Sequence, residues 1–295
     1  MIAGLEHVGI VTGAVDASIG FWHELLSTDV LERHVARGAW DPGRHGLFSA
    51  TYLPVPHSET LLELVHAETQ WSHEGWRDTD IGAIHVALHV KDADRTLVRL
   101  ASDTRSTAIP YGPCRGGRSA YLADPGGMSV QLMQLVRRPG GMPIIAADGW
   151  IDHVGVVVEN MARSVSFYRQ LLGADPIAEN AWRGTNSEYV GRMLGQPGLE
   201  LEAVHFRLPG GNAQLELVQY SGISQGRRSA ADRRSGGHFA FLAERTTGTP
   251  ETIAEEAVVV PSGRYQGAYE LRTNDPDGVP ISIIYPRQNR RHAAR

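Results

Sequence analysis

The sequence carries the same set of motifs twice, 146 residues apart. Residues 5–11 read LEHVGIV and residues 151–157 read IDHVGVV, so this offset places His7 on His153. Three further pairs follow in the same order: LLELV with QLELV, AIHVALHV with GGHFAFLA, and YLADPGGMSVQLM with LRTNDPDGVPISI. Because all four blocks recur in one order, we interpret the chain as a duplicated half.

The duplication defines the predicted domain organisation. A length of 295 residues is typical of about two domains. We predict a first domain over 1–136, a linker over 137–149, a second domain over 150–286 and a flexible tail over 287–295. The predicted linker, RRPGGMPIIAADG, is rich in Pro, Gly and small residues, and the tail, RQNRRHAAR, is basic and polar.

Each half in turn contains two related units. His7 and His85 both lie in short β-branched runs, and each run is followed by apolar residues at helical spacing. Strand-like runs come next, with strong turn signals, DPGG at 124–127 and DPDG at 275–278, before the last run of each half. The order strand, helix, three strands, repeated four times, predicts an α+β fold.

The composition excludes several classes of protein. Hydrophobic residues make up 42% and charged residues 21%, which is typical of a packed core and not of a disordered chain. A net charge of −5 argues against a nucleic-acid-binding surface that covers the protein. The single cysteine, Cys114, excludes an intrachain disulfide and a cysteine-rich zinc cluster. No signal peptide and no run of about 18 apolar residues is present, so we expect a cytoplasmic protein without a membrane partner.

Polar residues inside the apolar strands are the candidate functional residues. Glu63 lies between two leucines, and because strand side chains alternate between faces, it points away from both. His7, His85 and Gln131 have similar settings. A carboxylate in an apolar strand is costly unless a partner such as a divalent metal offsets its lost hydration. Taken singly, such residues are usually hydrogen-bonded or solvent-facing, but the ordered recurrence of His and Glu favours a metal: Zn²⁺, Fe²⁺, Ni²⁺, Co²⁺ or Mn²⁺.

The pattern HVGIVxxxxDxSIxFW, LELV, IHVAL and DPGGxxVQLMQ resembles the vicinal oxygen chelate superfamily, which includes glyoxalase I, epimerases, extradiol ring-cleaving dioxygenases and bleomycin-resistance proteins. The resemblance implies four βαβββ modules that pair into two curled, open-barrel (cup) domains, each around a metal. If modules pair within each half, it implies two ligand sets: His7, Glu63, His85 and Gln131 in the first half, and His153, Glu216 and His238 in the second. The fourth position of the second half holds Ser282, a poor metal ligand.

The function that the resemblance favours is that of a divalent-metal-dependent lyase or isomerase of the glyoxalase or epimerase type. Its small-molecule substrate would be chelated through adjacent oxygens, with proton transfer via a metal-stabilised enolate. Glu63 would then serve as ligand and base. Both a monomer and a homodimer are compatible with two cups in one chain.

Two alternatives stay open. One is an Fe²⁺-dependent, ring-cleaving type of dioxygenase that uses His153, Glu216 and His238. The other is a metal-free small-molecule binding or resistance protein. Its pocket would be lined by aromatic residues: Trp40, Tyr52, Trp182 and Tyr189.

Overall fold

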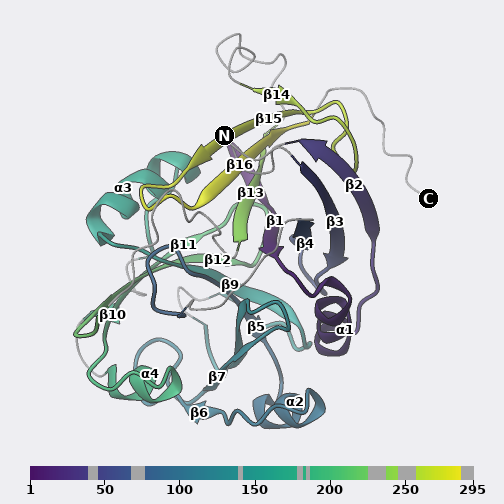
Figure 1. Cartoon of the computed structure of the whole chain (residues 1–295). Coiled ribbons are helices and arrows are strands. Elements are labelled where there is room, and N and C mark those ends of the chain that lie inside the picture. Colours follow the sequence, from purple (N-terminus) through teal and green to yellow (C-terminus); the bar gives the residue numbers. More distant parts are fainter. Residues whose placement is uncertain are drawn as a thin grey trace.

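The computed structural model describes residues 1–38, 46–67, 77–138, 142–177, 182–183, 187–224, 237–244 and 257–286. These residues form two eight-stranded sheets with helices at their margins (Figure 1). The predicted α+β fold of four modules paired into two cups is confirmed. None of the described helices is long and apolar enough to cross a membrane.

Each module begins with a strand, and in the first three modules a helix follows directly. The first module contains β1 (Ile2–Val11), α1 (Val15–Leu26), β2 (Glu32–Gly38), β3 (Gly46–Pro54) and β4 (Leu61–Ala67). The second contains β5 (Ile84–His89), α2 (Ala93–Arg99), β6 (Thr107–Ala108), β7 (Arg118–Ala123) and β8 (Ser129–Gln134). The third contains β9 (Trp150–Val157), α3 (Met161–Leu172), β10 (Trp182–Arg183), α4 (Ser187–Met193), β11 (Glu200–Arg207) and β12 (Gln214–Ser221). The fourth contains β13 (Gly237–Ala243), β14 (Val258–Val259), β15 (Tyr269–Asn274) and β16 (Pro280–Tyr285).

The modules pair across the two halves of the chain. One sheet has the order β14-β15-β16-β13-β1-β4-β3-β2 and so joins the first and fourth modules; we call it the 1–4 sheet. The other, the 2–3 sheet, has the order β10-β11-β12-β9-β5-β8-β7-β6. The assumption that modules pair within each half is therefore wrong. β9, which follows β8 in the chain, lies in the same sheet, and β5 separates the two strands. The ranges 1–136 and 150–286 mark the two sequence repeats, and as domain boundaries they stay a prediction.

The largest apolar core of the described residues contains side chains from both sheets. Alternate residues of the central strands belong to it, because one face of each strand is apolar throughout. Its fully buried members include Val8, Ile10, Leu62, Leu64, Val154, Val156, Leu215 and Leu217. Each such side chain contributes roughly 1.5–3 kcal/mol by leaving water. The opposite face of the same strands is thereby left for the polar residues.

Helix-to-turn hydrogen bonds hold each half together. Nε1 of Trp22 in α1 donates to Oδ2 of Asp124 at 3.3 Å, and the hydroxyl of Tyr168 in α3 donates to Oδ2 of Asp275 at 3.1 Å. The other oxygen of Asp275 accepts the backbone N–H of Val279 at 2.8 Å, which closes the DPDG turn. Since α1 belongs to the first module and the turn at Asp124 to the second, and α3 and the turn at Asp275 to the third and fourth, these bonds link modules that the sheets do not pair.

The Asp275→Asn substitution is expected to change the pH dependence of stability. Burial raises the pKa of Asp275 from 3.8 to about 6, and nearby Asp277 adds to the effect. A carboxyl that binds its proton more tightly when folded stabilises the fold below pH 4, and this stability is lost as pH rises through 6. The wild type should therefore lose about 3 kcal/mol of unfolding free energy relative to Asp275→Asn as pH rises from below 4 to above 6, and about half of this loss falls between pH 5 and pH 8. Urea denaturation of both proteins at pH 5 and pH 8 measures it; parallel pH profiles would contradict the expectation.

Candidate metal centres

Three buried side chains converge on the polar face of the 1–4 sheet. Nε2 of His7 lies 3.1 Å from Nε2 of His238 and 3.3 Å from Oε2 of Glu63. Nε2 of His238 lies 3.1 Å from the same carboxylate oxygen. We call this cluster the 1–4 site.

The register of three strands explains this convergence. Gly9 of β1 pairs with His238 on one side and with Glu63 on the other, and His7 lies on the same face. A Cβ atom at Gly9 would lie only 1.8 Å from Cε1 of His238. The glycine therefore makes room for the imidazole that comes from the other half of the chain.

The 2–3 sheet carries a second cluster of the same design, the 2–3 site. Nε2 of His85 lies 3.2 Å from Nε2 of His153 and 3.3 Å from Oε2 of Glu216, and His153 lies 3.4 Å from that oxygen. Here Gly155 pairs with both His85 and Glu216. A Cβ atom at Gly155 would lie 1.9 Å from Cε1 of His85, so in this site too a glycine makes room for an imidazole.

A carboxylate fixes the orientation of one imidazole in each cluster. Nδ1 of His7 donates to Glu6, and Nδ1 of His153 donates to Oδ2 of Asp152 at 2.9 Å. These neighbours in sequence can meet because the strand register shifts at Glu6 and at Asp152, which makes a β-bulge at each. With the proton on Nδ1, the lone pair of Nε2 faces the centre, as in metal-binding histidines.

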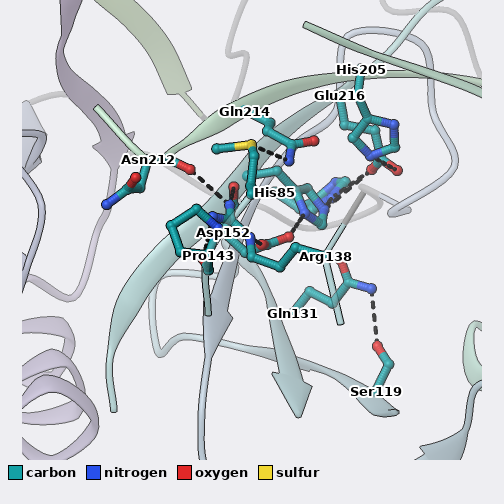
Figure 2. Close-up of polar contacts among 12 residues, drawn as sticks. His85, Ser119, Gln131, Arg138, Pro143, Asp152, His205, Asn212, Gln214 and Glu216 are labelled. Atoms are coloured by element: carbon teal, nitrogen blue, oxygen red, sulfur yellow. Dashed lines mark hydrogen bonds and ion pairs between the residues drawn. The ribbon is translucent and has the colours of Figure 1, made fainter. Parts of the chain in front are cut away.

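Both carboxylates are themselves held by the structure. The hydroxyl of Tyr265 donates to Glu6 at 2.7 Å, and Nε of Arg138 donates to Asp152 at 2.7 Å (Figure 2). Sequence reasoning missed Glu6 and Asp152, although the acid directly before His in both LEHVG and IDHVG was a readable signal.

The electrostatics of both centres favour a positive charge. Burial lowers the pKa of His7, but Glu63 and Glu6 outweigh it and raise this pKa to about 10. Burial lowers the pKa of His153 as well, and Glu216 and Asp152 raise it to about 9. A bound proton or a metal ion can supply this charge.

The donor atoms fit one metal ion at each centre. Their separations of 3.1–3.4 Å match the edges of a tetrahedral site, about 3.3–3.4 Å for bonds of about 2.0–2.1 Å. Among the described residues, Oε2 of Glu63 is buried without a hydrogen bond of good geometry, which leaves it available as a ligand. His7, Glu63 and His238, and separately His85, His153 and Glu216, therefore could each hold a metal.

The predicted division of the candidate ligands into two sets was wrong. His85 does not join His7 and Glu63, because it lies in the other sheet with His153 and Glu216. His238 takes its place in the 1–4 site. The set His153, Glu216 and His238, which we predicted for an oxygenase, is likewise divided between the two sheets. Cross-half pairing of the modules is the physical reason for all three corrections.

The fourth predicted positions differ between the sites. Nε2 of Gln131 donates to Oγ of Ser119 at 3.0 Å, while its Oε1 is buried without a hydrogen bond among the described residues. At the corresponding register in the 1–4 sheet, Oγ of Ser282 donates to Glu270 at 2.6 Å. Glu270 also pairs with Arg272 at 2.7 Å. Sequence reasoning missed Glu270, since only the cross-strand packing places it near the site.

In each cluster a residue of the neighbouring strand contacts Oε1 of the glutamate: a tyrosine in the 1–4 site and a histidine in the 2–3 site. Tyr52 lies opposite Glu63 in the sheet, and its hydroxyl donates to Oε1 at 2.6 Å. His205 lies opposite Glu216, with Nε2 at 3.2 Å from Oε1 (Figure 2). In both sites the contact leaves Oε2 directed at the histidines.

The cavities beside the two clusters differ in volume by nearly an order of magnitude. The 1–4 site opens into a cavity of about 420 Å³, which Tyr52, Glu270 and Arg272 also line. The cavity at the 2–3 site measures about 50 Å³ and is lined by Tyr121, Tyr189 and Tyr220. Of the predicted aromatic lining, Tyr52 and Tyr189 thus lie at different sites. Trp40 and the side chain of Trp182 lie outside the described residues.

Comparison with known proteins agrees with this architecture. The model of the Glyoxalase/Bleomycin resistance protein/Dioxygenase superfamily matches residues 4–132 and 150–283, so the chain belongs to this superfamily. A 2-epi-5-epi-valiolone epimerase from an Actinomyces species is 26% identical over 175 residues, which cover 51% of this chain and 93% of that protein.

Two solved structures share the fold over nearly the whole chain. Glyoxalase I from Zea mays is 18% identical, with a TM-score of 0.57 and coverage of 96% of this chain and 92% of that one. A putative dioxygenase from Bacillus subtilis subsp. subtilis str. 168 is 13% identical, with a TM-score of 0.59 and coverage of 96% and 85%. The predicted superfamily membership is confirmed.

Proposed function

We propose that the protein is a divalent-metal-dependent isomerase or lyase that acts on a small molecule at the 1–4 site. The observation that carries the proposal is the convergence of two imidazole nitrogens and one carboxylate oxygen beside a cavity of about 420 Å³. Of the two clusters, this one has room for a substrate. The similarity to an epimerase supports the isomerase reading.

His7, Glu63 and His238 would hold the metal. A divalent cation bound there supplies a Lewis acid that polarises substrate oxygens and stabilises the charge left by proton removal. Glu6 keeps the proton of His7 on Nδ1, and Tyr52 keeps Oε1 of Glu63 turned away from the centre. These contacts hold the ligand atoms in place before substrate binds.

Glu270 is the general base that we favour. Glu63, our predicted ligand and base, has no oxygen left for a substrate proton, because Oε1 accepts a hydrogen bond from Tyr52 and Oε2 would bind the metal. Burial raises the pKa of Glu270, but its hydrogen bonds from Arg272 and Ser282 outweigh burial and lower it. The carboxylate is therefore ionised at neutral pH and lines the cavity, where it can accept a proton from a substrate.

The Glu270→Gln substitution is expected to lower turnover by about 100-fold or more, as for loss of a general base. The bound metal should stay at the wild-type level, because Glu270 is not a ligand. Glu63→Gln is the matched control and should reduce both metal content and turnover. The measurements are metal content by mass spectrometry and deuterium uptake from D₂O into the substrate. 2-epi-5-epi-valiolone is the first compound to test, since the relative is named for its epimerisation.

The metal analysis decides whether the proposal stands. Less than about a tenth of an equivalent of metal per chain, with no gain on metal addition, would remove it. Tight binding of a small molecule by the metal-free protein would then favour the binding or resistance reading.

A second candidate function is an Fe²⁺-dependent dioxygenase. The observation that favours it is the two-histidine, one-carboxylate set of His7, His238 and Glu63, a donor set suited to Fe²⁺ and O₂. Oxygen uptake with a catechol-like substrate under Fe²⁺ would support this reading. Metal-dependent turnover without oxygen would support the isomerase.

A further inference from the structure

His34 is a cavity-lining residue that the candidate metal centre does not use. It lies on β2, is partly buried, and lines the cavity of the 1–4 site. Its ring stacks on the ring of Tyr52, with centroids 5.8 Å apart and an angle of 18° between the planes. Tyr52 in turn contacts His7 edge-on, with centroids 5.6 Å apart. His34 is therefore a neighbour of the candidate ligands without being one of them.

A glycine from the other half of the chain makes room for this ring. Gly263 lies between β14 and β15 with φ at +76°, a conformation that favours glycine. A Cβ atom there would lie 2.8 Å from Cε1 and 2.9 Å from Nδ1 of His34. The packing against Tyr52 and Gly263 fixes the position of the imidazole before a substrate binds.

The two ring nitrogens of His34 have different surroundings. Nδ1 is buried and has no hydrogen-bond partner among the described residues. A proton on Nδ1 would be a buried donor without an acceptor, which is rare in folded proteins because it costs free energy. The neutral imidazole therefore carries its proton on Nε2, the nitrogen that is left to meet a molecule in the cavity. His34 thus presents one N–H donor to the cavity.

The arginines described in the cavity are matched by carboxylates. Nη2 of Arg272 lies 2.7 Å from Oε2 of Glu270, and Nε of Arg264 lies 3.4 Å from Oε1 of Glu6. Glu63 would face the divalent ion. Two arginines and a divalent ion against three carboxylates leave a net charge of about one positive, so the described residues offer no surplus of cations for a phosphate or a dicarboxylate. A substrate that is uncharged until it loses a proton fits this balance.

The rest of the cavity is small and largely apolar. Its volume of about 420 Å³ lies at the lower end of the range for small-molecule sites, roughly 300–1,000 Å³. The fourth module contributes Val258, Val259, Val260 and Pro261 to its wall. Such a wall suits the C–H groups of a compact carbon skeleton, so the oxygens of a substrate would be directed to the metal and to His34.

We propose that the 1–4 site takes an uncharged, polyoxygenated small molecule, and that His34 determines this specificity by donating from Nε2 to a third substrate oxygen, beyond the two that the metal would bind. The inference rests on the proposed function, because the metal supplies the first two contacts. A molecule with only two oxygens would leave the N–H of His34 without a partner, and a site built for a hydrogen bond discriminates against such a molecule.

Calorimetric titration of the zinc-loaded full chain with three cyclic probes tests this proposal. The first probe, 2-keto-myo-inositol (the inositol ketone), is uncharged and carries further hydroxyl groups beside a ketone–hydroxyl pair. The second, 2-hydroxycyclohexanone, has only that pair, and the third, quinate, is a polyhydroxylated carboxylate. We expect the inositol ketone to bind about tenfold more tightly than either of the others.

Two variants separate the donor of His34 from its packing. His34→Phe removes the donor and keeps a ring on Tyr52, whereas His34→Gln keeps an N–H donor near the place of Nε2. We expect His34→Phe to bind the inositol ketone about tenfold more weakly and 2-hydroxycyclohexanone within about twofold of the wild type. His34→Gln should recover part of this loss. Zinc content and circular dichroism should stay at the wild-type level in both, because His34 is not a ligand.

The possible results distinguish this inference from the proposed function. Tighter binding of quinate than of the inositol ketone would overturn the uncharged substrate class. Equal losses for both ketones in His34→Phe, or no loss for either, would overturn the role of His34. A wild type that binds zinc but no inositol ketone would overturn the inference and leave the proposed function standing. His34-dependent binding of the inositol ketone by a protein that takes up no zinc would remove the proposed function and support the His34 contact.

Discussion

Gly9→Ala is expected to abolish productive metal binding at the 1–4 site and to lower turnover by at least about 100-fold. The added Cβ would lie 1.8 Å from Cε1 and 2.0 Å from Nδ1 of His238. Gly9 pairs with both flanking strands, so its backbone cannot retreat. The imidazole must rotate instead, which removes one of the three donors. The measurements are zinc content and turnover.

Two glycine variants serve as controls for this prediction. Gly155→Ala should affect the 2–3 site in the same way, through the ring of His85, and leave the donors of the 1–4 site in place. Gly20→Ala, in α1, meets no atom within 4 Å and should be neutral or slightly stabilising. Wild-type zinc content and turnover in Gly9→Ala would show that His238 is not a ligand.

Arg138→Met is expected to lower the free energy of unfolding by about 3–5 kcal/mol, the usual result of removing one partner from a buried ion pair. The Arg138 side chain is fully buried, and its Nε lies 2.7 Å from Oδ1 of Asp152. Its terminal nitrogen also donates to the carbonyl of Asn212 at 2.7 Å (Figure 2). The guanidinium stacks over the ring of Trp150, 4.6 Å from its centroid. Without it, the carboxylate of Asp152 stays buried, and among the described side chains His153 is the one that still donates to it. Urea denaturation measures the loss.

The neighbouring residue supplies the control. Arg137 is exposed and donates to the carbonyl of Gly112, so Arg137→Met should change stability by no more than about 0.5 kcal/mol. A loss below about 1 kcal/mol for Arg138→Met would contradict the prediction. The buried ion pair also shows that Arg138, the second residue of the predicted linker over 137–149, belongs to the packed structure.

The structure groups the predicted residues differently from the sequence analysis, and their role as metal ligands stays a prediction. Each predicted histidine and glutamate lies in one of the two clusters, because the side-chain alternation that puts Glu63 opposite its leucine neighbours is a local property of a strand. Glu270 escaped prediction, since it approaches the 1–4 site only through the pairing of β15 with β16. The acids before His7 and His153 reach them only because of two bulges.

The sequence by itself determined the duplication, the order of elements in the modules and the polar strand faces that carry the candidate donor residues. These follow from short-range patterns: strand periodicity, turn residues and a repeat at fixed offset. The tertiary structure alone decided that His7 meets His238 and that His85 meets His153. Four similar modules offer similar strand edges, so no local pattern specifies which edges pair. The packing of side chains distant in sequence also decided that the larger of the two cavities lies at the 1–4 site.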